Sequence, residues 1–274
     1  GLVGQNACVE VDGAAYWMSE NGFFRYGGKL ESLKCLVEDF VYDDINLNSG
    51  NQMVSAGLNN LFGEVTWYYP QSTSSVVNRM VTYNYFDSSP QRPVWTVGSL
   101  ARTMWRDSAV FGKPHALEYT AGNDSSFDVV GNTEGRTAYY EHETGTDQNK
   151  NGTITAVLAN ISSGDYDITQ RVMRGAGGVA DFRGDGEHIM KIRRFVPDFV
   201  SQTGTTRVTL ELKNYPNDTA ASSPLGPFDI TSSTTKVDTR ARARAISLKI
   251  ENTAASQSWK LGTFRLDVQP DGRR

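Results

Sequence analysis

Apolar and polar residues alternate with a period of two along most of this 274-residue chain. The alternating segments are rich in Val, Thr, Tyr, Phe and Trp, whereas the i, i+3, i+4 stripe of an amphipathic helix is scarce. Since successive side chains of a β-strand point to opposite faces of a sheet, this pattern predicts strand after strand, each with one buried and one solvated face. We therefore expect an all-β protein.

Strands that end in paired aromatic residues recur in the first half of the chain. Examples are Tyr16-Trp17, Trp67-Tyr68-Tyr69 and Tyr139-Tyr140, and Asn21-Gly22 predicts a type I′ hairpin turn. Loosely repeated groups of this kind are typical of β-propeller blades, and we expect about three of them in residues 1–150. Because propellers close with about four to eight blades, we expect a partial or complete β-propeller-type domain, with further blades upstream of Gly1, or an open β array.

A polar stretch at residues 145–152 contains no large apolar residue and predicts a domain boundary near residue 150. Five or six further strands follow in residues 151–274. In residues 206–213, Val208, Leu210 and Leu212 alternate with polar neighbours. We therefore expect a C-terminal β-sandwich domain.

The formal net charge of −4 hides an uneven distribution. Residues 1–151 contain 10 Lys and Arg against 18 Asp and Glu, and residues 152–274 contain 17 against 13. The total argues against a dedicated nucleic-acid binder, which needs a basic surface to displace counterions from phosphates. Opposite signs on the two halves predict domains, or neighbouring copies, that meet through complementary fields.

The two cysteines, Cys8 and Cys35, are too few for a disulfide framework or a zinc site. We expect two buried thiols in a protein made in a reducing cytosol, with a Cys8–Cys35 bridge as the alternative. The first residues lack the basic head and apolar stretch of a signal peptide, and no apolar run is long enough for a transmembrane helix.

Three arginines, Arg240, Arg242 and Arg244, alternate in the segment that continues into Ile246, Leu248 and Ile250. On one strand these side chains share a face, with successive arginines about 6.8 Å apart. The arginine end is expected to overhang the sandwich edge and to contact carboxylates of the acidic domain or of another copy. An ordinary solvated strand end and a phosphate-binding row remain the alternatives.

Other candidate sites are weaker. The letters from Asp147 match the front of a calcium loop at Asp147, Asn149, Asn151, Gly152 and Ile154, but Leu158 occupies the position of the bidentate Glu, which favours an Asx-rich turn. His115, His142 and His188 show no metal-ligand spacing and are expected in turns or on the surface. The glycines at 175–178 are typical of a flexible loop, and Asp43-Asp44 and Asp165/Asp167 are expected in turns. We expect no cofactor and no metal.

Several strings resemble virion proteins of short-tailed bacteriophages, with the tail nozzle or DNA-stabilisation family as the closest description. They include the runs that begin at Ala15, Gly63, Asn78 and Val94, and later SGDYDI, RRFVPDF and WKLGTFRLDVQPDGRR. The resemblance extends from about Val9 to Arg274. It implies a β-propeller-based subunit, several copies of which, typically six, form a ring or tube below the portal and adaptor, through which the genome leaves.

The resulting expectation is a non-enzymatic virion component, assembled in the host cytoplasm, with copies of itself and adaptor or portal-proximal tail proteins as partners. Genomic DNA would pass through without specific binding, because an acidic lining repels phosphates. One alternative is a receptor- or glycan-binding tail protein in which Trp105 or Tyr119 stacks on sugars. The second is a propeller-type glycan hydrolase.

Overall fold

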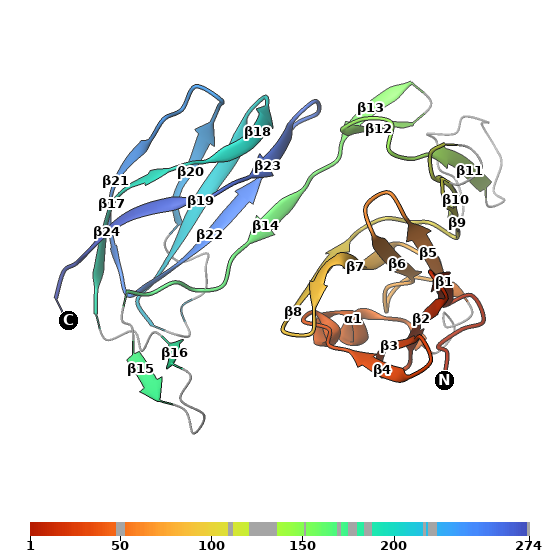
Figure 1. Ribbon diagram of the computed structural model, residues 1–274. Helices are drawn as coiled ribbons and strands as arrows, with labels where there is room; N and C mark the ends of the chain where they lie inside the picture. The colour runs from red at the N-terminus through yellow and green to blue at the C-terminus, as the bar shows by residue number, and fades with distance from the viewer. Residues whose placement is uncertain are drawn as a thin grey trace. The chain divides into compact units, whose positions relative to one another are not determined.

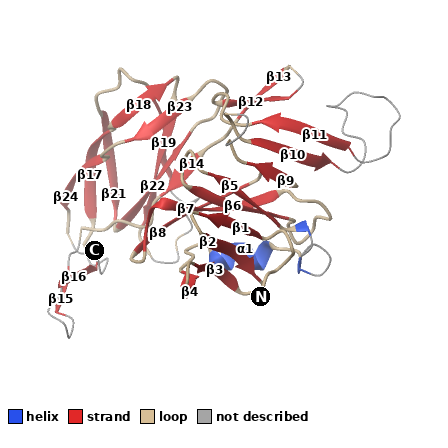
Figure 2. Cartoon of the chain, turned by 45° about the vertical axis from the view of Figure 1, so that its right-hand side comes forward, coloured by secondary structure: helices blue, strands red, loops and turns tan. Residues whose placement is uncertain are grey.

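The computed structural model describes residues 1–47, 53–108, 112–120, 136–150, 152–168, 171–174, 180–183, 188–215, 218 and 224–272. In these residues the chain forms antiparallel sheets and one short helix, α1 (Glu38–Asp44) (Figures 1 and 2). The predicted all-β class is therefore confirmed. Alternation also predicts a strand at 127–131, and this strand and the predicted glycine loop at 175–178 lie outside the described residues.

The chain divides into two compact units, Gly1–Thr144 and Gly145–Arg274. Each has its own buried apolar cluster. The sequence placed the change at about residue 150, and the structural division falls at the start of the same polar stretch.

The described residues of the first unit form three antiparallel sheets, each built from strands that are consecutive in the sequence. The first sheet is formed by β1 (Cys8–Val11), β2 (Ala14–Ser19), β3 (Gly22–Tyr26) and β4 (Leu30–Leu33). The middle sheet is formed by β5 (Ser55–Asn59), β6 (Glu64–Tyr69), β7 (Arg79–Ser89) and β8 (Arg92–Gly98). The last sheet is formed by β9 (Met104–Arg106), β10 (His115–Thr120) and β11 (Arg136–Glu141).

The first strands of these sheets lie next to one another. Asn6, just before β1, forms a parallel bridge with Ser55 of β5, and the Ser55 hydroxyl reaches the carbonyl of Arg102, just before β9. Figure 2 shows the middle sheet between the first and the last. The unit is therefore a row of three meanders whose first strands run side by side.

Aromatic residues hold the first two sheets together. Phe23 lies 4.9 Å from Trp67 and 4.8 Å from Trp95, measured between ring centroids. The Trp67 indole is fully buried and donates to the carbonyl of Ala7 at 3.0 Å, which satisfies its polar atom. Of the paired aromatics in the sequence, Tyr16, Trp67 and Tyr69 thus lie in the core of the unit, whereas Trp17 and Tyr139 do not.

The predicted hairpin of β2 and β3 is present, but its turn is shifted by one residue. Ser19 pairs with Gly22, so the loop residues are Glu20 and Asn21. Gly22 adopts a φ of +143°, whereas neither Glu20 nor Asn21 has a positive φ. The type I′ turn at Asn21-Gly22 is therefore wrong, because the strand register follows burial of Met18 and Phe23 and not the turn letters.

The second unit is built around two sheets that share one core. One has the order β14-β22-β19-β20, with β14 (Asn160–Ser162), β22 (Ala245–Glu251), β19 (Thr206–Lys213) and β20 (Pro224–Ile230). The other has the order β21-β17-β24, with β21 (Val237–Ala243), β17 (Met190–Val196) and β24 (Arg265–Pro270). Phe195 of β17 contacts Phe228 of β20, and the cluster joins both sheets into the predicted sandwich.

Among the described residues of this unit there are also three two-stranded sheets. They are formed by β12 (Asp147–Lys150) with β13 (Thr153–Ala156), β15 (Arg171–Arg174) with β16 (Ala180–Arg183), and β18 (Phe199–Thr203) with β23 (Ser258–Leu261). The described part of the unit has more strands than the five or six expected, because some alternating runs break into two strands and because short strands such as β12 and β15 form outside those runs.

Candidate functional site: a basic sheet face in the second unit

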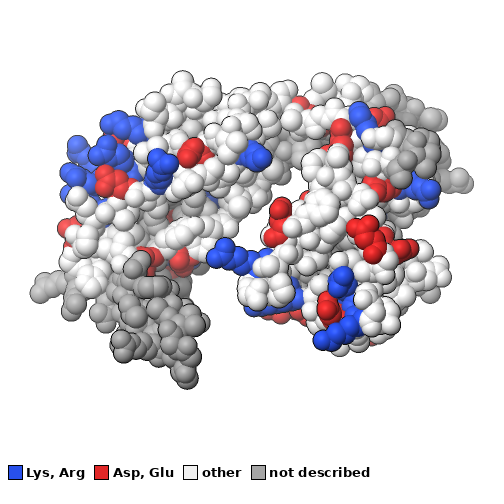
Figure 3. All heavy atoms as spheres, viewed as in Figure 1, with Lys and Arg blue, Asp and Glu red and all other residues white. Residues whose placement is uncertain are grey.

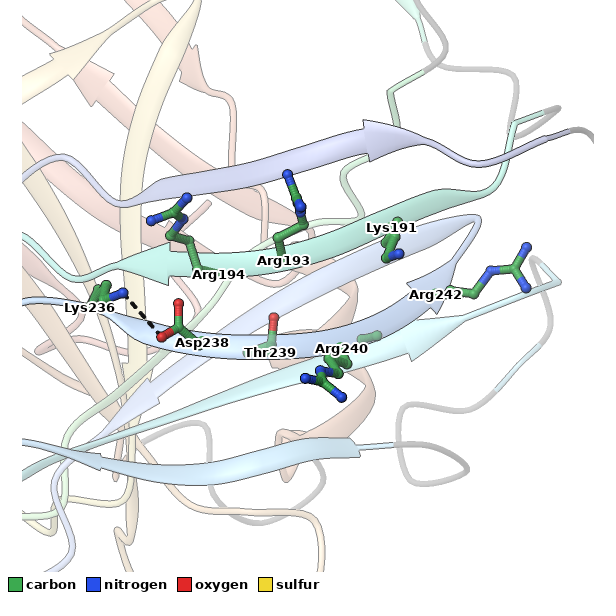
Figure 4. Close-up of a pocket in the computed structure, with 9 residues that line it drawn as sticks. Lys191, Arg193, Arg194, Lys236, Asp238, Thr239, Arg240 and Arg242 are labelled. Atoms are coloured by element: carbon green, nitrogen blue, oxygen red, sulfur yellow. Dashed lines mark ion pairs between the residues drawn. The ribbon is translucent and has the colours of Figure 1, made fainter.

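Cationic side chains gather on the outer face of the sheet β21-β17-β24. On β17 the residues Met190, Ile192 and Phe195 are buried, and on β21 the residues Ala241 and Ala243 are buried. The intervening residues point away from the core. With Lys236 they form what we call the basic face: Lys191, Arg193, Arg194, Lys236, Arg240 and Arg242. Figure 3 shows this cluster, and Figure 4 shows how its side chains lie.

A β-bulge concentrates the charge. The register of β17 against both neighbouring strands shifts between Ile192 and Arg194. Two consecutive residues, Arg193 and Arg194, therefore both lie on the outer face, while Ile192 and Phe195 remain in the core. The buried Thr239 hydroxyl donates to the carbonyl of Ile192 at 3.0 Å and satisfies the backbone at this irregularity.

Only part of this charge is neutralised. Arg194 pairs with Asp267 at 3.0 Å, and Arg242 pairs with Asp271. Lys236 pairs with Asp238 at 3.2 Å, the dashed line in Figure 4.

The charges at the centre of the basic face are not neutralised in this way. Within the described part of the chain, Lys191, Arg193 and Arg240 have no ion-pair partner. Lys191 also lies directly opposite Arg242 in the strand register. Like charges in directly opposed positions destabilise a strand pair. This opposed pair adds no attraction between β17 and β21, and an anionic group bound beside Lys191 would offset the repulsion.

The side chains of the face are chemically suited to anionic groups. Its cations line an open groove of about 570 Å³. A guanidinium group presents parallel N–H donors that match a carboxylate or a phosphate, and successive outward residues of β21, such as Arg240 and Arg242, lie about 6.8 Å apart. An extended ligand with repeated negative groups fits this spacing.

The predicted arginine row is only partly correct. Arg240 and Arg242 lie on the basic face, but Arg244 sits at a break where the chain leaves β21 and enters β22 of the other sheet. Before this break the inward-pointing residues have odd numbers, and after it they have even numbers. The core therefore contains Ile246, Leu248 and Ile250. The single continuous strand expected from the alternation is therefore wrong. Arg244 is half-buried, and its backbone N–H donates to the carbonyl of Lys213.

Sequence reasoning missed the β17 half of the face. Lys191 and Arg193 alternate with Ile192 in the sequence, which was a usable signal for an outward basic row. Nothing local marks the bulge that adds Arg194, because a bulge depends on the register of two partner strands.

A second polar cluster lies between the sheets of the first unit. Arg102 is 3% exposed, its guanidinium pairs with Glu118 at 2.8 Å, and it lies 4.2 Å from the centroid of the Tyr140 ring. Its Nε donates to Nε2 of His142 at 2.9 Å. Burial, followed by the Arg102 charge, lowers the pKa of His142 to about 4. A surface or turn position for His142 was therefore a wrong prediction, and this cluster fastens β9, β10 and the end of β11.

The cysteines are free thiols, and the expectation that both are buried is wrong. Cys8 is exposed and Cys35 is half-buried. Burial raises the pKa of Cys35 to about 11 and also raises the pKa of Cys8.

The calcium-like letters form a hairpin turn between β12 and β13. Asn149 accepts the N–H of Gly152 at 3.0 Å, and both carboxylate oxygens of Asp147 accept the N–H of Ser256, at 2.9 and 2.8 Å. Asn151 lies outside the described residues. In the described parts of the chain, no group of three or more His, Cys, Asp or Glu side chains is placed to hold a metal ion.

The remaining candidates have structural contacts. Asp44, on α1, pairs with Arg79 at 3.2 Å, and Asp165 pairs with Lys213 at 2.9 Å. Trp105 is half-buried against Tyr68 and donates to the carbonyl of Leu58, so its ring is not presented for stacking on a sugar. Tyr119 is 41% exposed. His115 stacks on Tyr139, and His188 is half-buried before β17.

Comparison of the chain with models of protein families and with curated proteins found no match. Over the described residues, no helix has the length and apolar character to span a bilayer.

Proposed function

We propose that this protein is a non-catalytic structural subunit of a bacteriophage tail, of the nozzle type, in which several copies form a ring or tube for retention and ejection of the genome. The observation that carries the proposal is the order of sheets in the first unit. The first unit forms consecutive meanders whose first strands, β1, β5 and β9, adjoin one another, and this order supports a propeller-type unit, which is built from successive four-stranded meanders. A propeller-type subunit is what the resemblance to nozzle proteins implies.

Charge supports the same assignment. The first unit, residues 1–144, contains 9 Lys and Arg against 17 Asp and Glu. An acidic surface along a channel repels DNA phosphates, so a duplex slides past it, whereas a basic lining would retain the DNA in a salt-dependent way. An assembly with Lys and Arg along its lumen would contradict this part of the proposal.

The test is made on purified particles. Mass spectrometry should detect the chain in the virion, and imaging of the intact tail should locate it below the portal and adaptor. Particles assembled without it should package DNA and then lose it, measured as nuclease-sensitive genome. Absence of the chain from purified particles would refute the proposal.

The basic face favours a second candidate, a receptor-binding tail protein. Its unpaired cations, Lys191, Arg193 and Arg240, would hold carboxylate or phosphate groups of a bacterial surface polysaccharide. Specific binding of the isolated chain to such a polysaccharide, together with a tail position away from the channel axis, would select this candidate over the nozzle.

A further inference from the structure

The two terminal sheets of the first unit each present an apolar outer face. In the first sheet, Tyr16, Met18 and Phe23 point into the core, so their strand neighbours Trp17 and Phe24 point outward. These two rings stack at 5.7 Å across β2 and β3. We call the surface of Cys8, Trp17, Phe24, Tyr26 and Leu30 the front face.

The last sheet has a matching surface at the opposite end of the row. Trp105 points inward, onto Gly57 and Tyr68 of the middle sheet. Met104, Leu117 and Tyr139 therefore point outward, and the register places them directly beside one another across three strands. We call these three residues the back face.

Both faces are exposed in the unit. Tyr26 and Leu30 are 51% and 59% exposed on the front face, and Met104 and Tyr139 are 53% and 64% exposed on the back face. Inside the unit, the same kind of surface is buried by a neighbouring sheet, as Phe23 is by Trp67 and Trp95. The internal interfaces thus show which type of partner, another antiparallel sheet, fits such a face.

Charge identifies the pairing of front with back. Glu10 is exposed on β1 at the front face, and Arg106 is exposed on β9 at the back face. Neither has an ion-pair partner within the described residues. Ser55 contacts both Asn6 and Arg102, so these three residues lie side by side across the starts of the three sheets. Glu10 follows Asn6 by four residues, and Arg106 follows Arg102 by four residues. A second copy that continues the series β1, β5, β9 would therefore bring its Glu10 beside Arg106.

We propose that the front face of one copy packs on the back face of the next, with Glu10 paired to Arg106 across the contact. This contact joins unlike surfaces, so it is heterologous and propagates into a ring or an open helical array. It rests on the proposed function in that it supplies the contact by which the tail subunit assembles. The occupant of each face is a sheet of the same chain.

Charge exchange tests the contact. Glu10→Arg and Arg106→Glu should each weaken self-association about tenfold, because a wrong-sign pair replaces an attractive one. The double variant restores opposite charges across the same contact and should recover assembly. Glu20→Arg, in the exposed turn after β2, is the matched control and should associate as the wild type does. Sedimentation velocity over a range of concentrations measures each association.

Apolar contact is tested separately. Leu30→Asp or Met104→Asp should abolish assembly, while Val200→Asp, a 67% exposed position on β18 in the second unit, should not. Circular dichroism would establish that each variant is folded. Cys8 provides an independent readout, since a thiol reagent should label it in the dissociated chain and be slowed in the assembled one.

Two results would overturn the contact: assembly that is unchanged in both charge variants, or a double variant no better than the singles. Oligomers that survive these substitutions refute the contact and leave the tail-subunit proposal intact. Particles that lack the chain refute the tail-subunit proposal, whatever the charge variants show.

Discussion

Lowering the pH should destabilise the first unit through His142. The Arg102 Nε–H needs an unprotonated acceptor at Nε2 of His142, so the folded state holds this imidazole neutral. Burial and the Arg102 charge lower its pKa from 6.5 to about 4. The unfolded chain binds a proton near pH 6.5 and the folded chain does not. Stability is therefore full above pH 6.5, falls between pH 6.5 and about pH 4, and is constant below that as far as His142 contributes.

The magnitude follows from the same contact. A difference between 6.5 and about 4 corresponds to about 3 kcal/mol at 1.36 kcal/mol per pKa unit. His142 is half-buried, and solvent screening reduces the expected loss to about 2 kcal/mol. Urea unfolding at neutral pH and at pH 4.5 measures it. Trp105, whose ring lies 4.6 Å from His142, gives a local fluorescence signal.

The control is His142→Gln, whose amide oxygen can accept the Arg102 N–H and does not titrate. This variant should lose the part of the pH dependence that lies between pH 6.5 and 4. An NMR titration of His142 should show its transition near pH 4. If His142 titrates near pH 6.5, or if the variant keeps the full pH dependence of the wild type, the electrostatic reasoning is refuted.

Three further predictions concern packing and the basic face. Gly57→Ala places a Cβ 2.6 Å from Cγ of Trp105, so it should cost about 1–3 kcal/mol of unfolding free energy, measured by urea denaturation; an unchanged midpoint would contradict the tight contact. Phe195→Ala should cost about 3–5 kcal/mol, because Phe195 is fully buried between the two sandwich sheets; calorimetry of the second unit checks this. Arg193→Ala and Arg240→Ala should each weaken binding of inorganic polyphosphate about tenfold without lowering the thermal midpoint, since they remove unpaired like charges; a lower midpoint with unchanged binding would show a structural role.

Local strand formation was well predicted from the sequence, because it depends on alternation within a few residues. The string EVTWYY coincides with β6 (Glu64–Tyr69), and RVTLELK lies within β19 (Thr206–Lys213), with Val208 and Leu210 buried as expected. The aromatic group Trp67-Tyr68-Tyr69 ends β6 as expected, whereas Tyr16-Trp17 lies in the middle of β2. These features need no knowledge of distant residues.

A long alternating run was read as a single strand, and this is where the prediction failed. The run from Arg240 to Ile250, expected as one strand, becomes β21 and β22 in two different sheets. A strand that crosses between sheets can keep its alternation in the letters while its inward side changes. The change at Arg244 is set by where each sheet ends, which is a property of the sandwich as a whole.

The candidate sites divide in the same way. Alternation in the sequence predicted that Arg240 and Arg242 point outward, because this prediction depends on a single strand. The basic face itself requires β17 beside β21 and the bulge at Arg193, and the His142 cluster requires Arg102, 40 residues away, to fold onto the same spot. Period-two patterning determined that this chain forms sheets with one solvent-exposed and one buried face. Tertiary structure decided which solvent-facing strands lie side by side and which of their cations have no ion-pair partner among the described residues. The reason is that burial and strand register act between residues that are far apart in the sequence.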